Sequence, residues 1–169
     1  GGKISNLREI IHQEMKKEGT ECRCIRCREI GSLKPKTKDL KLKRIDYAAS
    51  NGQEIFLSFE DVKLDKIVAL LRLRILKPDS DLSDNIFPVL KNSAIIREIH
   101  TYGQIERLKH KGKTQHIGLG KKLIIEAEKI TKKEFGLKKI SVISGVGVRN
   151  YYKKLGYKLR DTYLTKNIT

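Results

Sequence analysis

A predicted amphipathic helix at residues 118–135 lies between two stretches with the pattern of β-strands, and this order constrains the fold more than any other feature. The strand patterns cover residues 93–102 and 139–144. The apolar residues of the helix recur at helical spacing: Leu119, Leu123, Ile124, Ala127 and Ile130. Gly136 lies where a left-handed C-terminal cap belongs. A helix between two strands of one sheet predicts a right-handed parallel crossover.

The remaining elements follow from periodicity and turn residues. Apolar residues at helical spacing between Ile4 and Met15 predict an N-terminal helix that ends near Lys17. Alternating runs on either side of Asn51-Gly52 predict a β-hairpin. The other predicted elements are a strand at 67–75, a helix at 148–155 and a strand at 157–167. The chain is therefore expected to be α+β, with several antiparallel strands preceding the crossover.

The 169 residues carry 37 Lys and Arg against 20 Asp and Glu, a formal net charge of +17. This charge favours a polyanionic partner, although a solvated lysine-rich surface is the alternative. No apolar run reaches membrane-spanning length, and no secretory signal is evident, so a cytoplasmic protein is expected. The first residues are Gly1-Gly2 rather than Met, which suggests an excised piece of a longer protein. We expect residues 1–41 to form a helix, a cysteine loop and a basic linker, and residues 42–169 to form the sheet domain.

The turn before helix 118–135 has the features of a pyrophosphate cradle. Two glycines let the backbone approach an anion, and the N–H groups of the next helical turn point toward it. An ordinary glycine-punctuated helix start without a ligand is the alternative. The candidate cofactor-binding residues here are Gln115, His116, Ile117, Gly118, Leu119, Gly120 and Lys121.

Two further segments carry candidate catalytic groups. Alternation in strand 93–102 predicts one face with Glu98, His100 and Tyr102, and another with Ile95, Arg97 and Ile99. Glu98 or His100 is a candidate general base. Alternatively, Glu98 is a cross-strand partner of Arg72 or Arg74, and His100 is a structural histidine. The second segment is Asn150-Tyr151-Tyr152-Lys153-Lys154-Leu155-Gly156-Tyr157, whose plainer interpretation is a helix closed by a glycine cap.

These motifs resemble those of the GNAT acetyltransferases. The segment at 115–120 is similar to the Gln/Arg-x-x-Gly-x-Gly/Ala signature that holds the pyrophosphate of acetyl-CoA, and residues 151–157 are similar to an aromatic-Tyr-x-x-x-Gly-aromatic motif. The resemblance implies a GNAT-like mixed, mostly antiparallel sheet in which strands 93–102 and 139–144 splay apart around the cofactor. It implies that Tyr152 protonates the departing thiolate, with Tyr151 as a possible substitute. It also implies that Asn150 and Tyr152 are among the acetyl-CoA-binding residues.

The resemblance narrows to the acetyltransferase domain of the catalytic subunit of Elongator. It rests on segments 97–103, 115–120 and 142–152, and on the cysteine segment 22–31. The family implies an enzyme that carboxymethylates the tRNA wobble uridine U34. There a radical S-adenosylmethionine domain with an iron–sulfur cluster activates the acetyl group of acetyl-CoA. This chain has no Cys-x3-Cys-x2-Cys motif, so that cofactor and cluster belong to a missing domain of the parent.

The expected role is then to bind acetyl-CoA and tRNA and to hydrolyse acetyl-CoA in a tRNA-dependent way. Two alternatives stay open. One is a protein lysine N-acetyltransferase with Glu98 as base, and the other is a non-catalytic RNA-binding module on the same fold. The sequence does not decide whether the chain forms a dimer.

Three cysteines in one short segment, Cys22, Cys24 and Cys27, favour a structural zinc site. Such a site requires a fourth ligand, and the sequence does not choose among His12, His100, His110 and His116. Free thiols in a reducing compartment are the alternative. Basic residues on both sides of the cysteines are expected to contact tRNA phosphates rather than bases: Arg23, Arg26, Arg28, Lys34, Lys36, Lys38, Lys41, Lys43 and Arg44.

Overall fold

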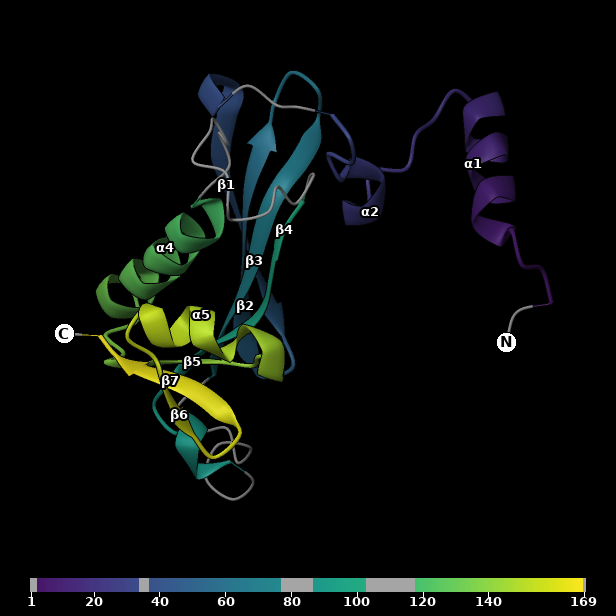
Figure 1. Ribbon diagram of the computed structural model, residues 1–169. Helices are drawn as coiled ribbons and strands as arrows, with labels where there is room; N and C mark the ends of the chain where they lie inside the picture. The colour runs from purple at the N-terminus through teal and green to yellow at the C-terminus, as the bar shows by residue number, and fades with distance from the viewer. Residues whose placement is uncertain (1–2, 34–36, 77–86, 103–117, 169) are drawn as a thin grey trace.

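The sheet has seven strands in the order β1-β2-β3-β4-β5-β7-β6 (Figure 1). The structure is a computed structural model that describes residues 3–33, 37–76, 87–102 and 118–168. The strands are β1 Leu40–Ala49, β2 Gly52–Asp61, β3 Lys66–Leu76, β4 Ala94–Thr101, β5 Lys139–Val142, β6 Lys158–Arg160 and β7 Tyr163–Asn167. Among these strands β4 and β5 pair in parallel and the other neighbours are antiparallel. The predicted mixed, mostly antiparallel α+β sheet with one parallel crossover is confirmed.

The helices surround this sheet unevenly. They are α1 Leu7–Lys17, α2 Ile25–Arg28, α4 Leu119–Lys133 and α5 Arg149–Lys154, with the 3-10 turns η1 Thr37–Asp39, η2 Pro88–Leu90 and η3 Val146–Val148. The apolar stripe of α4 is buried against one face of the sheet, as its spacing predicts. By contrast, none of the residues of α1 is buried, and this helix lies beside α2 away from the sheet (Figure 1). No helix in the described part of the chain is long and apolar enough to cross a membrane.

The main core lies between the sheet and helices α4 and α5. Ile55, Leu71 and Ile96 of three neighbouring strands and Leu123 of α4 belong to one buried cluster. The cluster also includes Ile30, whose backbone N–H donates to Ile67 O at 3.0 Å. The segment after α2 is therefore packed on the sheet, although a loop and a basic linker are what the sequence predicts up to residue 41.

The β1–β2 hairpin is displaced by one residue from its predicted position. Its two-residue loop is Ser50-Asn51, with φ angles of 42° and 57°, whereas Gly52 already pairs with Ala49. Close packing, not a left-handed backbone, requires glycine at position 52. A Cβ atom there would lie 2.7 Å from the carbonyl oxygen of Ile75.

The predicted strand 157–167 is wrong as a single element. It is a hairpin of β6 and β7, in which Arg160 pairs with Tyr163. Asp161 has a φ of 52°, a left-handed conformation, so a β-strand, whose residues have negative φ, cannot continue through it. Aspartate tolerates this conformation better than most residues, and the turn folds β6 back along β7 at the edge of the sheet.

Candidate active site and metal centre

The N-terminus of α4 presents open backbone amides. Gly118, the residue before the helix, has a φ of 108°, and its carbonyl accepts from the Lys122 N–H at 2.8 Å. Glycine has no side chain that could cap the first turn. The first N–H groups of a helix have no acceptor within it, and none is found for those of Leu119, Gly120 and Lys121 among the described residues. These amides can therefore bind an anion, assisted by the helix dipole. The other predicted cradle residues, Gln115, His116 and Ile117, lie outside the described residues.

Gly120 packs against the end of β4 and against α5. A Cβ atom at this position would lie 3.4 Å from the hydroxyl oxygen of Tyr151, 3.5 Å from Cγ2 of Thr101 and 3.7 Å from Cδ1 of Ile99. The helix start, the end of a strand and a tyrosine hydroxyl thus meet at one point. Nothing in the sequence pattern singles out Thr101 or Ile99 as neighbours of the predicted cradle.

Strands β4 and β5 separate close to this point. Their parallel pairing covers Ala94 to Ile96, and the Ile143 N–H donates to the Ile96 carbonyl at 3.2 Å where the pairing ends. Strand β4 continues to Thr101, paired on its other side with β3. Backbone groups of β4 beyond Ile96 therefore have no β5 partner among the described residues, and we call this unpaired stretch the gap in the sheet; it agrees with the splay that the resemblance implies.

The two adjacent tyrosines of α5 have different environments. Tyr152 is 3% exposed and belongs to the main core, where its ring contacts that of Tyr157 edge-on at 5.8 Å. Burial raises the pKa of Tyr152 to about 12. Tyr151 is 42% exposed, and burial raises its pKa as well. The Tyr151 hydroxyl lies beside Gly120. Tyr151, which the resemblance suggests only as a possible substitute for Tyr152 as proton donor, therefore has its hydroxyl at the N-terminus of α4.

A bulge in β4 changes which residues share a face. Arg72 pairs with Glu98 and Leu73 pairs with Ile96, which leaves Arg97 as an extra residue. Ile96 and Ile99 consequently both contact the main core, on the α4 side. The prediction that Ile95 and Ile99 share a face is therefore wrong, because strict alternation fails at the bulge.

Glu98 and His100 lie together on the opposite face, as predicted. The Glu98 carboxylate is 3.1 Å from Arg72 Nε and 3.2 Å from His100 Nε2. The His100 ring stacks on Tyr102 with centroids 6.0 Å apart. The cross-strand partner role that was the alternative for Glu98 is thus present in the structure.

The first turn of α5 completes this region. Asn150 is exposed beside Tyr151. Ser144 Oγ and Arg149 Nε are buried atoms without a hydrogen-bond partner among the described residues. Serine and arginine in a loop after a strand give no signal in the sequence, so these two polar groups near the splay were not predicted.

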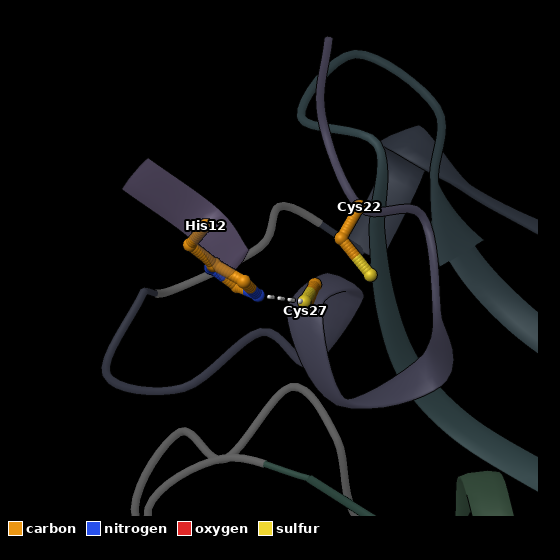
Figure 2. A group of neighbouring side chains, drawn as sticks. All are labelled: His12, Cys22 and Cys27. Atoms are coloured by element: carbon orange, nitrogen blue, oxygen red, sulfur yellow. Dashed lines mark hydrogen bonds between the residues drawn. The ribbon is translucent and has the colours of Figure 1, made fainter. Parts of the chain in front are cut away.

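His12 joins the cysteine segment, as Figure 2 shows. The ligand atoms of His12, Cys22 and Cys27 all lie within 4.8 Å of one another, and His12 Nε2 is 3.4 Å from Cys27 Sγ. Cys24 Sγ is 3.5 Å from Cys27 Sγ, close to the separation of about 3.8 Å between thiolates on one tetrahedral zinc ion. Among the four candidate histidines His100 is engaged in β4, and His110 and His116 lie outside the described residues. The geometry therefore favours His12 as the fourth ligand.

The cysteine segment has thiols with shifted pKa values and is held in place by two arginines. The backbone N–H of Cys27 lowers the pKa of Cys24 to about 7, whereas desolvation raises the pKa of Cys27 to about 11. The Arg8 guanidinium of α1 donates to Cys27 Sγ at 3.0 Å. Arg28 of α2 binds Glu60 at 2.5 Å and Asp65 at 2.9 Å, and so ties α2 to the sheet.

The predicted tRNA-binding residues divide into two groups. Four of them form ion pairs: Arg23 with Asp65, Arg28 with Glu60 and Asp65, Lys43 with Glu60, and Arg44 with Asp46 and Glu134. Arg26, Lys38 and Lys41 are exposed and form no ion pair within the described ranges. Lys34 and Lys36 lie outside the described residues. The exposed group has the charge most accessible to a polyanion.

Comparison with known proteins gives a consistent set of relatives. No protein-family model matches the chain. It is 46% identical to the tRNA uridine(34) acetyltransferase of Methanocaldococcus infernus over 99% of its own length, and 46% identical to Elongator complex protein 3 of Saccharomyces cerevisiae over 96%. The chain spans 32% and 30% of these two relatives.

A solved structure supports the same relationship. The archaeal Elongator protein three of Methanocaldococcus infernus, with an N-terminal deletion, superposes with a TM-score of 0.79 at 46% identity. The match covers 98% of this chain and 40% of the solved one. In sequence and in fold, the chain is a homologue of one segment of Elongator complex protein 3 and of the tRNA uridine(34) acetyltransferases.

Proposed function

We propose that this chain is the acetyl-CoA-binding acyltransferase domain of an Elongator-type enzyme that modifies the tRNA wobble uridine U34. The observation that carries the proposal is the meeting of open amides at Gly118–Lys121, the end of β4 and the Tyr151 hydroxyl beside a gap in the sheet. A pyrophosphate needs such amides, and an extended thioester arm needs such a gap. The parent enzyme would add the radical S-adenosylmethionine domain and its iron–sulfur cluster, and the location would be cytoplasmic.

Each group at the mouth of α4 has a role in this proposal. The amides of the first helical turn hold the diphosphate, and unpaired backbone groups of β4 after Ile96 hold the arm. Acetyl-CoA supplies an activated acetyl thioester. A backbone N–H near the end of β4 polarises its carbonyl, and Tyr151 stands where a proton is needed by a departing thiolate. Because the pKa of Tyr151 is raised, its hydroxyl keeps its proton at neutral pH.

Calorimetric titration with acetyl-CoA tests the cofactor site. Gly120→Glu places a carboxylate beside the open amides, where it repels a diphosphate and fills the cradle. Lys129→Glu is the matched control, because Lys129 is exposed two turns further along the same helix. We expect Gly120→Glu to abolish measurable binding and Lys129→Glu to leave it within about twofold, since a single exposed charge contributes little. Equal affinity in both variants would refute the site.

Turnover assays then separate the substrates. Acetyl-CoA hydrolysis that is stimulated by tRNA supports the proposal, and acetylation of a lysine peptide supports a protein acetyltransferase. Binding of tRNA without any acetyl-CoA binding would support a non-catalytic RNA-binding module. Glu98 is held by Arg72 and His100, an arrangement that suits a structural carboxylate better than a free general base.

The metal centre forms a second part of the proposal. Cys22, Cys24, Cys27 and His12 together offer three thiolates and one imidazole, the donor set of a structural zinc site without an open position. Zinc there would link α1 to α2, and Arg28 would link α2 to the sheet. Its role is therefore to fix the N-terminal segment rather than to take part in acyl chemistry.

A further inference from the structure

A second basic region lies far from the cysteine segment, at the opposite end of α4 from the cofactor site. It is a cavity of about 1120 Å³ between η2, the C-terminal end of α4 and the end of β7. In Figure 1 the C-terminus lies at the left of the view, whereas α2 and α1 lie to the right of the sheet. The 15 residues of α4 separate its two ends by about 22 Å, so the cavity is distinct from the mouth of the helix.

The lining of the cavity combines positive charge with an apolar surface. Four lysines contribute to it, namely Lys91, Lys132, Lys138 and Lys139, and no aspartate or glutamate among the described residues does. Pro88, Leu137 and Ile168 supply apolar atoms, and Asn92 and Asn167 supply side-chain amides. Such a lining suits a ligand that has an anionic group and a flat or apolar part.

Three of the cavity lysines have no ion-pair partner among the described residues. Lys132, Lys138 and Lys139 form no ion pair with any other residue in the described part of the chain. Partial burial and the charge of Arg160 lower the pKa of Lys139. The carbonyl end of α4 contributes only about half a negative charge, so three lysines outweigh it.

We propose that this cavity is a second contact site for RNA, where lysines bind backbone phosphates and the apolar surface receives a base or ribose of an unpaired nucleotide. The inference rests on the proposed function, since it assigns a further surface to the same tRNA substrate. A folded RNA distributes phosphates over a long surface. Positive charge without an ion-pair partner in the described ranges, at Lys132, Lys138 and Lys139 here and at Arg26, Lys38 and Lys41 elsewhere, suits such a ligand better than a small anion.

Charge reversal in a matched pair of variants tests the site. Lys132→Glu/Lys138→Glu changes two cavity lysines, and Lys122→Glu/Lys129→Glu changes two exposed lysines of α4 that do not line the cavity. In fluorescence anisotropy with tRNA we expect the cavity variant to bind about tenfold more weakly and the control less than about threefold more weakly. The salt dependence of log Kd should fall by about two for the cavity variant, one for each lost phosphate contact.

A measurement on the unaltered chain removes any dependence on folding of the variants. Labelling with an amine-reactive acetyl ester, followed by mass spectrometry, should show that tRNA protects Lys132 and Lys138 but not Lys122 and Lys129. Equal loss of affinity in both variants, or equal protection by heparin, would refute the site and leave only a general electrostatic surface. Acetyl-CoA titration in the same samples distinguishes this result from failure of the cofactor site.

Discussion

The two glycines at the start of α4 should respond in opposite ways to substitution by alanine. Gly118 has a φ of 108°, outside even the left-handed region that other residues occasionally occupy. Gly118→Ala should therefore cost about 2 kcal/mol of backbone strain, within the range for such conformations. Gly120 lies within the helix, and a Cβ there meets its neighbours at no less than 3.4 Å, an ordinary contact. Gly120→Ala should instead gain up to about 0.5–1 kcal/mol of helix propensity.

Thermal unfolding followed by circular dichroism measures this difference. For a domain of this size about 2 kcal/mol corresponds to a fall of roughly 4–8 °C in Tm for Gly118→Ala, whereas Gly120→Ala should leave Tm unchanged or raise it. Gly145→Ala is the control, because no described residue lies within 4 Å of a Cβ at Gly145 and its φ is −62°. Acetyl-CoA affinity should fall for Gly118→Ala because the first amides change direction. Equal Tm values for the two variants at 118 and 120 would contradict the assignment of strain to Gly118.

Three further predictions follow from the site and the sheet. Tyr151→Phe should leave acetyl-CoA affinity unchanged and lower the rate of thioester hydrolysis, whereas Tyr152→Phe should leave that rate within about twofold; the reverse order in steady-state assays would return the proton-donor role to Tyr152. Metal analysis should find about one zinc per chain. His12→Ala should lower zinc affinity at least about tenfold without changing acetyl-CoA affinity in calorimetry. Full retention of zinc by His12→Ala would contradict the proposed ligand set. Gly52→Ala should lower the free energy of unfolding by about 1–3 kcal/mol in urea titration because its Cβ meets the Ile75 carbonyl at 2.7 Å; a neutral result would mean that the hairpin relaxes freely.

The order of elements could be predicted from the sequence because each relied on a strong local signal. The apolar stripe of α4 and the crossover on both sides of it are determined by spacing over many residues. Local signals failed where one residue changes the register. Asn51-Gly52 indicated a hairpin correctly, but pairing of Ala49 with Gly52 moved the loop to Ser50-Asn51.

The candidate site was predictable only in part, because its geometry depends on contacts between distant segments. The motif of Gly118 and Gly120 is recognisable in the sequence. The choice between Tyr151 and Tyr152 as proton donor depends on which hydroxyl the packing of α5 turns toward α4. His12 is 15 residues from Cys27, and no spacing rule connects it to the cysteines. Only the folded arrangement of α1 beside α2 identifies it among four histidines.

The extra residue in β4, Arg97, changes which residues of the strand face α4 and which face the opposite side of the sheet. Before Arg97 the even-numbered positions Ala94 and Ile96 face α4, and after it the odd-numbered Ile99 does so, which sends Glu98 and His100 outward. If β4 kept its length but paired with β3 in strict alternation without this bulge, the residues after Arg97 would exchange faces, turning charged groups into the core and aliphatic ones into water. The chemical identity of each surface along the last half of β4 thus depends on the bulge, and deletion of Arg97 should leave Ile99 on the core face and Glu98 and His100 on the outer face.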